Sequence, residues 1–170
     1  MTAFSTRPWV GIPAERPIVV GVEPGQDPRV LHRAGEVAGI YGTGVVATWV
    51  DPTHVLVTSE LSGVPALAPV DPDATNGDDI TTLDEQVHAL VRGELTPSGV
   101  PWRFVRGSGE VARGLAEAAR EYRAPMIVVG ARRPGFSGWM NEVIGGSVAG
   151  HLVHTQEVPV LVVPLGQEGR

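Results

Sequence analysis

Two groups of residues in the C-terminal part of the chain have the types and spacing needed to bind an anion. Gly130 ends a short apolar run and is followed by Arg132 and Arg133. Gly146 and Ser147 stand directly before a stretch with helical periodicity. Glycines let a ligand approach the backbone, a serine hydroxyl adds a donor, and the N-terminus of a helix favours negative charge. These residues predict an anion site with two arginines at its mouth.

The same residues also have a purely structural interpretation. Glycines after a strand often serve only the geometry of a turn, and Ser147 is equally suited to cap the helix that follows it. All 13 basic residues are arginines, so a phosphate-binding lysine is excluded. The sequence contains neither a P-loop nor a G-x-G-x-x-G motif after its first strand. Both interpretations remain open at this point.

Runs typical of strands alternate with helical patterns along the whole chain. Apolar runs rich in β-branched residues predict five strands, at 17–22, 44–50, 100–105, 124–130 and 158–164. Asp27 followed by Pro28 is typical of a helix start, and Thr82 with Glu85 suggests a capping box that begins a second helix. Pro101 favours an edge position for the third strand.

This alternation favours parallel strands joined by right-handed crossovers. We expect an α/β fold: a single doubly wound, five-stranded parallel sheet in the flavodoxin-like order 3-2-1-4-5, with helices on both faces. Residues 1–16 are expected to form a loose N-terminal lead-in to a domain at 17–166. The proline-rich segment 51–79 is expected to be mostly loop, although residues 54–58 could pair locally.

The expected strand order also predicts where a ligand would bind. Open α/β sheets bind ligands beyond the carboxyl ends of their strands, at the point where the strand order reverses. In the order above, that point lies between the first and fourth strands. Glu23, directly after the first strand, would therefore face Gly130 and the 130–147 loop across a crevice.

Composition and charge exclude several classes of protein. The formal net charge of -6 argues against a general nucleic-acid binder. The absence of cysteine excludes disulfides and thiolate metal sites, and it favours a cytoplasmic location. No apolar run approaches the ~20 residues that a membrane helix needs, and the N-terminus lacks the pattern of a signal peptide. We therefore expect no membrane and no nucleic acid as partners.

Two weaker chemical signals are also present. Ser137 stands in the sequence Gly-Phe-Ser-Gly, which resembles the nucleophile elbow G-x-S-x-G but has its second glycine one residue early. His151 and His154 are three residues apart and would share one face of the last helix, but a metal site needs further ligands. A hydrolase is therefore the least favoured function, and no metal site is expected.

Several of these segments together resemble the universal stress protein (UspA) family. They are "IVVGV" near the start, "IVVG" with its glycine-rich loop, and "GGSVAGHLVHTQEVPVLVVP". The resemblance runs from Pro17 to Pro164 and implies the fold predicted above. It also implies a homodimer paired through the last strand, Val158 to Val163. Some members bind ATP, so the resemblance implies ATP or a related adenine nucleotide, with Mg²⁺, as a ligand.

The nucleotide-binding pattern of the family is G-x2-G-x9-G-(S/T). Gly130 matches its first glycine, and Gly146 with Ser147 matches its closing pair. Arg133 stands at the second glycine, and the segment before Gly146 is three residues longer than the pattern. An arginine at this position would either block the site or bind phosphate bidentately, and Arg132 would add charge beside it.

Two further positions follow from the resemblance. The first strand of the family usually ends in Asp followed by Gly-Ser, and this chain has Glu23, Pro24 and Gly25 there. The acidic role would pass to Glu23, although Pro24 removes one backbone donor. The family contacts adenine through backbone groups near the second strand, which implies a contact around Val46.

Three functions are consistent with these observations. The first is a ligand-binding regulatory module of the stress response, with at most slow ATP hydrolysis and no catalytic residue. The alternative is a homodimeric interaction protein of the same fold that binds no nucleotide because its site is occluded. A small α/β enzyme ranks last.

Overall fold

The structure is a computed structural model that describes residues 4–58, 65–70, 77–131 and 148–165. Its centre is a six-stranded sheet in the order β1-β6-β3-β2-β7-β8. The strands are β1 (Ser5–Thr6), β2 (Ile18–Val22), β3 (Val45–Asp51), β6 (Trp102–Ser108), β7 (Ile127–Gly130) and β8 (Val160–Val163). The five strands from β6 to β8 are parallel, which confirms the predicted order 3-2-1-4-5.

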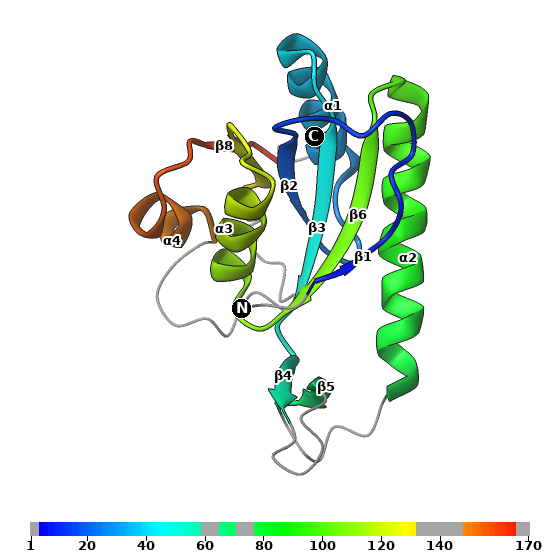
Figure 1. Ribbon diagram of the computed structural model, residues 1–170, viewed down its shortest axis with the longest axis vertical. Coiled ribbons are helices and arrows are strands. Elements are labelled where there is room, and N and C mark those ends of the chain that lie inside the picture. The colour runs from blue at the N-terminus through cyan, green and yellow to red at the C-terminus, as the bar shows by residue number, and fades with distance from the viewer. Residues whose placement is uncertain (1–3, 59–64, 71–76, 132–147, 166–170) are drawn as a thin grey trace, which may run out of the picture.

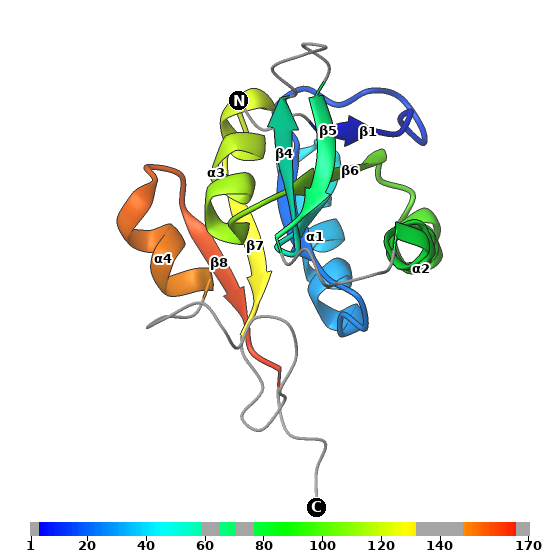
Figure 2. The same cartoon turned by 90° about the horizontal axis from the view of Figure 1, so that it is seen from below.

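Helices cover both faces of this sheet, as Figures 1 and 2 show. They are α1 (Pro28–Tyr41), α2 (Gly77–Leu95), α3 (Val111–Glu121) and α4 (Val148–Thr155), with a 3-10 turn η1 at Thr96–Ser98. The helices α1 and α2 contribute buried residues to one core cluster, and α3 and α4 contribute to a second. The described part of the chain contains no helix long and apolar enough to cross a membrane.

The central strand β2 shows why two helical layers are needed. Ile18, Val20 and Val22 pack into the core under α1 and α2, whereas Val19 packs into the core under α3 and α4. Successive side chains of a strand point to opposite faces, so a strand that is apolar at every position requires cover on both sides. The continuous apolar run that predicts this strand is therefore explained by its central position in the sheet.

The start of α1 agrees with its prediction, and the start of α2 does not. Asp27 accepts a hydrogen bond from the Arg29 N–H at 3.0 Å and caps α1, with Pro28 at the first helical position. The helix α2 begins at Gly77, upstream of the predicted capping box. Ile80 and Leu83 already pack against the core, so tertiary packing extends the helix beyond the motif that predicts its start.

The N-terminal segment corrects two expectations. The sequence predicts a loose lead-in at residues 1–16, but Ser5 and Thr6 pair antiparallel with β6. The Arg7 guanidinium then donates to Asp84 at 2.5 Å and to Glu85 at 2.8 Å, both on α2. This arm covers backbone groups that an edge strand would expose. Consequently β6 lies between β3 and β1, and Pro101 precedes the strand without marking it as an edge.

The described residues of the segment after β3 include a two-stranded antiparallel hairpin. The predicted local pairing of residues 54–58 is confirmed: β4 (His54–Thr58) pairs antiparallel with β5 (Pro65–Pro69). The partner strand is not evident from sequence because it begins and ends with proline, which disfavours a strand. Figures 1 and 2 together place this hairpin beyond the carboxyl end of the sheet.

Gly44 provides a test of the packing at the amino end of the sheet. A Cβ atom there would lie 2.4 Å from the carbonyl oxygen of Pro101 and 2.8 Å from the Cβ of Ala14. We expect Gly44→Ala to destabilise the protein by about 1–3 kcal/mol, the usual effect of overpacking. Urea denaturation would measure this change as a lower midpoint.

Gly39 offers the matched control for that substitution. It is exposed on α1, and a Cβ atom added there would meet no heavy atom within 4 Å. Gly39→Ala should therefore stabilise the helix by about 0.5–1 kcal/mol. Equal midpoints for the two alanine variants would contradict the packing described for Gly44.

Candidate functional site

The chain leaves β2 through a tight turn at the carboxyl edge of the sheet. The Gln26 N–H donates to the Glu23 carbonyl at 3.0 Å. Pro24 and Gly25 occupy the central positions, and Gly25 has a φ of 73°. Proline followed by a residue with positive φ is the signature of a type II turn. This turn and the Asp27 cap that follows it hold Glu23 at the carboxyl end of β2.

Glu23 is the acidic residue that the sequence places at this edge. Its side chain is half-buried, and burial raises the pKa of its carboxyl above the ordinary value. Among the described residues the carboxyl has neither a hydrogen-bond donor nor an ion-pair partner. A carboxylate held in this way is unfavourable in the free protein. Perturbed carboxyls of this kind are concentrated at functional sites.

Gly130 ends β7, the strand that pairs with β2, and its small size has a structural reason. A Cβ there would lie 3.1 Å from Val30 Cγ2, 3.3 Å from Gln26 Nε2 and 3.3 Å from Leu165 Cδ1. The amide of Gln26, a residue only 8% exposed, therefore lies against Gly130. Gln26 ends the turn that follows β2, and its side chain packs against the end of β7. Nothing in its sequence context distinguishes it as a site residue.

The position predicted for the adenine contact, Val46, does not lie at the carboxyl edge. It is fully buried as the second residue of β3, near the amino end of the strand, and is paired with Val19 on one side and Arg103 on the other. Its backbone therefore belongs to the sheet. The residue of β3 that pairs with the end of β2 is Trp49, opposite Val22. β3 runs past the end of β2 only at residues 50–51, which pair with β6 on their other side.

The remaining predicted site residues, Arg132, Arg133, Gly146 and Ser147, lie outside the described residues. So does Ser137, the serine of the weak hydrolase signal. The described helix α4 begins at Val148, directly after this segment. The described residues thus include the two ends of the predicted anion-binding loop, Gly130 at the end of β7 and Val148 at the start of α4, and the loop itself stays a prediction.

The described residues give no support to a metal site. His151 and His154 are both exposed on α4, and His151 Nδ1 lies 3.8 Å from Glu110 Oε1. Within the described ranges, no three residues of the His, Cys, Asp and Glu types are close enough together to hold an ion. Glu110 has a local role instead, because its carboxylate caps α3 by accepting from the Ala112 and Arg113 N–H groups.

A group that the sequence does not single out lies at the end of β3. It consists of Asp51, Thr53 and His54, which we call the Asp51 cluster. Asp51 Oδ1 accepts from the Thr53 N–H at 2.9 Å and from Thr53 Oγ1 at 2.6 Å. Asp51 Oδ2 lies 2.8 Å from His54 Nδ1. The sequence signal for it, an Asp-Pro-Thr-His turn directly after an apolar strand, is visible only once the strand end is known.

Comparison with known proteins identifies the family of this chain. The model of the universal stress protein family matches residues 15–164, so the chain belongs to that family. No curated protein sequence matches it.

Solved structures of the same family share the fold. A universal stress protein from Archaeoglobus fulgidus is 24% identical, with a TM-score of 0.60 over 86% of this chain and 91% of the other. The protein from that organism in complex with dAMP is 20% identical, with a TM-score of 0.60 over 86% and 95%. A universal stress protein in complex with cAMP is 19% identical, with a TM-score of 0.56 over 90% and 99%.

The raised pKa of Glu23 leads to a testable dependence of stability on pH. The folded protein favours the neutral carboxyl, so the contribution of Glu23 to stability is greatest at acid pH and is lost as pH rises through its folded pKa. We therefore expect Glu23→Gln to raise Tm at pH 7. This gain should disappear below the ordinary pKa of glutamate, where the wild-type side chain is also neutral.

Thermal denaturation of Glu23→Gln and of an exposed control, Glu157→Gln, across this pH range would measure the effect. The control should show no comparable gain. A lower Tm of Glu23→Gln at pH 7 would show instead that the charged carboxylate has a stabilising partner in the free protein.

Proposed function

We propose that this protein is a nucleotide-binding regulatory module that holds ATP or a related adenine nucleotide at the carboxyl edge of its sheet. The observation that carries this proposal is the half-buried carboxyl of Glu23, which has no partner among the described residues and lies at the point where the strand order reverses. Ligands of open α/β sheets bind at this point. The dAMP and cAMP complexes of two structures with the same fold support a ligand of this class.

The proposed roles of the residues follow from their chemistry. Gly146 and Ser147, before α4, would give backbone and hydroxyl donors to the phosphates. Arg132 and Arg133 would add charge, because arginine binds phosphate bidentately. Glu23 would hold Mg²⁺, which favours carboxylate oxygens together with substrate phosphates. Binding of this anionic, metal-bearing ligand would relieve the unfavourable burial of the carboxylate.

We assign the protein a regulatory rather than a catalytic role in the stress response, with at most slow ATP hydrolysis. Ligand occupancy would control its conformation or its partners. The cytoplasmic location predicted from the sequence belongs to the same proposal. The alternative is an interaction protein of this fold with an occluded site. In that alternative Arg133, which replaces a glycine of the family pattern, would block the site.

Calorimetric titration with Mg-ATP tests the proposal directly. We expect wild-type protein to bind in the micromolar range and Gly146→Asp to lose binding, because an added carboxylate would repel the phosphates. The control Gly39→Ala should bind as wild type does. Absence of binding by folded wild-type protein, with no nucleotide released on its denaturation, would overturn the proposal and favour the occluded-site alternative.

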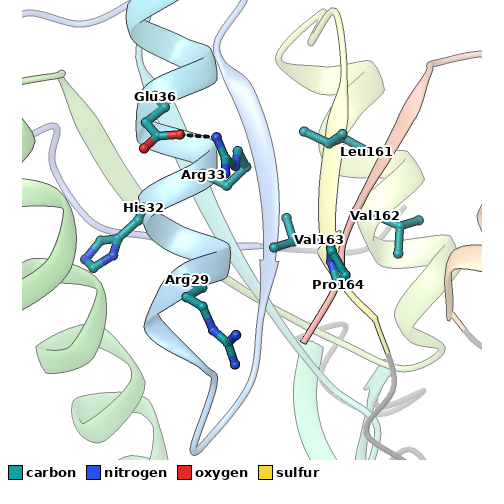
Figure 3. Close-up of a pocket in the computed structure, with 8 residues that line it drawn as sticks. All are labelled: Arg29, His32, Arg33, Glu36, Leu161, Val162, Val163 and Pro164. Atoms are coloured by element: carbon teal, nitrogen blue, oxygen red, sulfur yellow. Dashed lines mark hydrogen bonds and ion pairs between the residues drawn. The ribbon is translucent and has the colours of Figure 1, made fainter. Parts of the chain in front are cut away.

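We further propose that the protein forms a homodimer through the outer edge of β8. In the described part of the chain β8 pairs only with β7, and Val162 is 40% exposed. Leu161 to Pro164 and the polar face of α1 line a groove of about 330 Å³ along this edge. Figure 3 shows Arg33 and its partner Glu36 on α1 facing this strand. An apolar, unpaired edge strand is a template for pairing with a second chain.

The exposed valines on the two edges of the sheet provide a matched test of this dimer. Val162→Lys should convert dimer to monomer, because charge on an edge strand opposes edge-to-edge pairing. Val10→Lys alters a valine that is similarly exposed, at 43%, beside the opposite edge, and it should leave the dimer intact. Analytical ultracentrifugation would distinguish them. Dissociation by Val10→Lys alone would place the interface on the N-terminal arm.

A further inference from the structure

The Asp51 cluster holds one imidazole in a fixed orientation. The Asp51 side chain is only 2% exposed, and the His54 side chain is 17% exposed. A buried carboxylate requires donors, and Thr53 satisfies one of its oxygens with both its N–H and its hydroxyl. The other oxygen takes the His54 Nδ1 proton across 2.8 Å. Asp51 thereby fixes both the tautomer and the direction of the ring.

The second ring nitrogen of His54, Nε2, is the one that can accept a hydrogen bond from a ligand. With Nδ1 as the donor to Asp51, neutral His54 presents Nε2 as a hydrogen-bond acceptor. Within the described residues Nε2 has no hydrogen-bond partner. Ligand-binding groups are typically held in position by their neighbours before the ligand binds, with one acceptor or donor still unused. Nε2 of His54 meets this description. The Asp51 cluster has no role in the proposed binding of phosphate or Mg²⁺.

The location of the cluster indicates which part of a nucleotide it would meet. Asp51 ends β3 and His54 begins β4, so both lie at the carboxyl edge, where the hairpin extends from the sheet (Figure 1). The strands β3 and β7 flank β2 on opposite sides, which separates them by about 10 Å. Phosphates bound at the N-terminus of α4 lie on the β7 side. A nucleotide extending across the end of β2 therefore brings its ribose and base to β3.

We propose that His54, oriented by Asp51, accepts a hydrogen bond from a ribose hydroxyl of the bound nucleotide and thereby makes the site selective for ribonucleotides. This inference rests on the proposed function and deepens it. Acidic side chains commonly accept the ribose hydroxyl in nucleotide sites of α/β sheets. Here both oxygens of the Asp51 carboxylate already contact Thr53 and His54. The acceptor that would meet the ligand is therefore His54 Nε2, which Asp51 orients through Nδ1.

Two substitutions separate the two nitrogens of the ring. His54→Asn keeps a donor near the position of Nδ1, so Asp51 remains satisfied, and it removes Nε2. His54→Gln places a polar group near the position of Nε2 and gives up the contact with Asp51. His32→Asn is the control, since that histidine lies on α1 and its Nε2 contacts Glu94 at 2.5 Å. Thermal denaturation would establish that each variant is folded.

The measurement is the calorimetric affinity of each variant for Mg-ATP and for its 2′-deoxy and 3′-deoxy analogues. We expect wild type and His32→Asn to prefer ATP over at least one deoxy analogue by about tenfold, the effect of one hydrogen bond. His54→Asn should lose that preference by weakening ATP alone, and His54→Gln should retain part of it. A purely structural role would weaken all three ligands equally.

The outcomes distinguish this inference from the proposed function. Nucleotide binding with an unchanged ribose preference in His54→Asn would overturn the role of His54 and leave the nucleotide site intact. Equal affinity of wild type for ATP and both analogues would do the same. Failure of wild type to bind any of the three would overturn both proposals together.

Discussion

The placement of β2 between two parallel neighbours is the constraint on which the rest of this structure depends. β2 pairs with β3 on one side and β7 on the other, so its polar backbone is used along both edges. Its side chains are apolar in both directions, which requires helices on both faces. The chain leaves β2 toward one face, into α1, and leaves β7 toward the other, into α4. Because β2 and β7 are parallel, Glu23 and Gly130 lie at the same edge, where these two connections diverge.

Two carboxylates at the carboxyl edge of the sheet, those of Asp51 and Glu23, differ in how their burial is compensated by hydrogen bonds. Asp51 is almost completely buried, yet the Asp51 cluster supplies donors to both of its oxygens, so it forms a stable part of the structure. Glu23 is less buried but has no donor among the described residues, and its pKa is raised by burial. The unfavourable environment of Glu23 is tolerated because the surrounding turn and cap are well satisfied. Such uncompensated groups are characteristic of sites that a ligand completes.

Much of the fold could be predicted from the sequence, and each error has a physical cause. Continuous apolar runs identify β2, β3 and β7 because burial on both faces favours apolar residues at successive positions. The strand β1 contains only Ser5 and Thr6, and it exists because β6 offers it an edge and Arg7 reaches α2. The early start of α2 reflects the packing of Ile80, upstream of the capping motif, against the core. Tertiary contacts decide such features, and local sequence does not contain them.

The candidate site divides in the same way. The sequence by itself determined the parallel order of strands and, from it, the edge at which Glu23 and Gly130 meet, because alternating periodicity and right-handed crossovers leave few topologies. Only the tertiary structure decided that Val46 belongs to the sheet interior, since depth along a strand depends on register with its neighbours. It alone decided that Asp51 and His54 meet, since their contact depends on where β3 ends and on how the chain turns there.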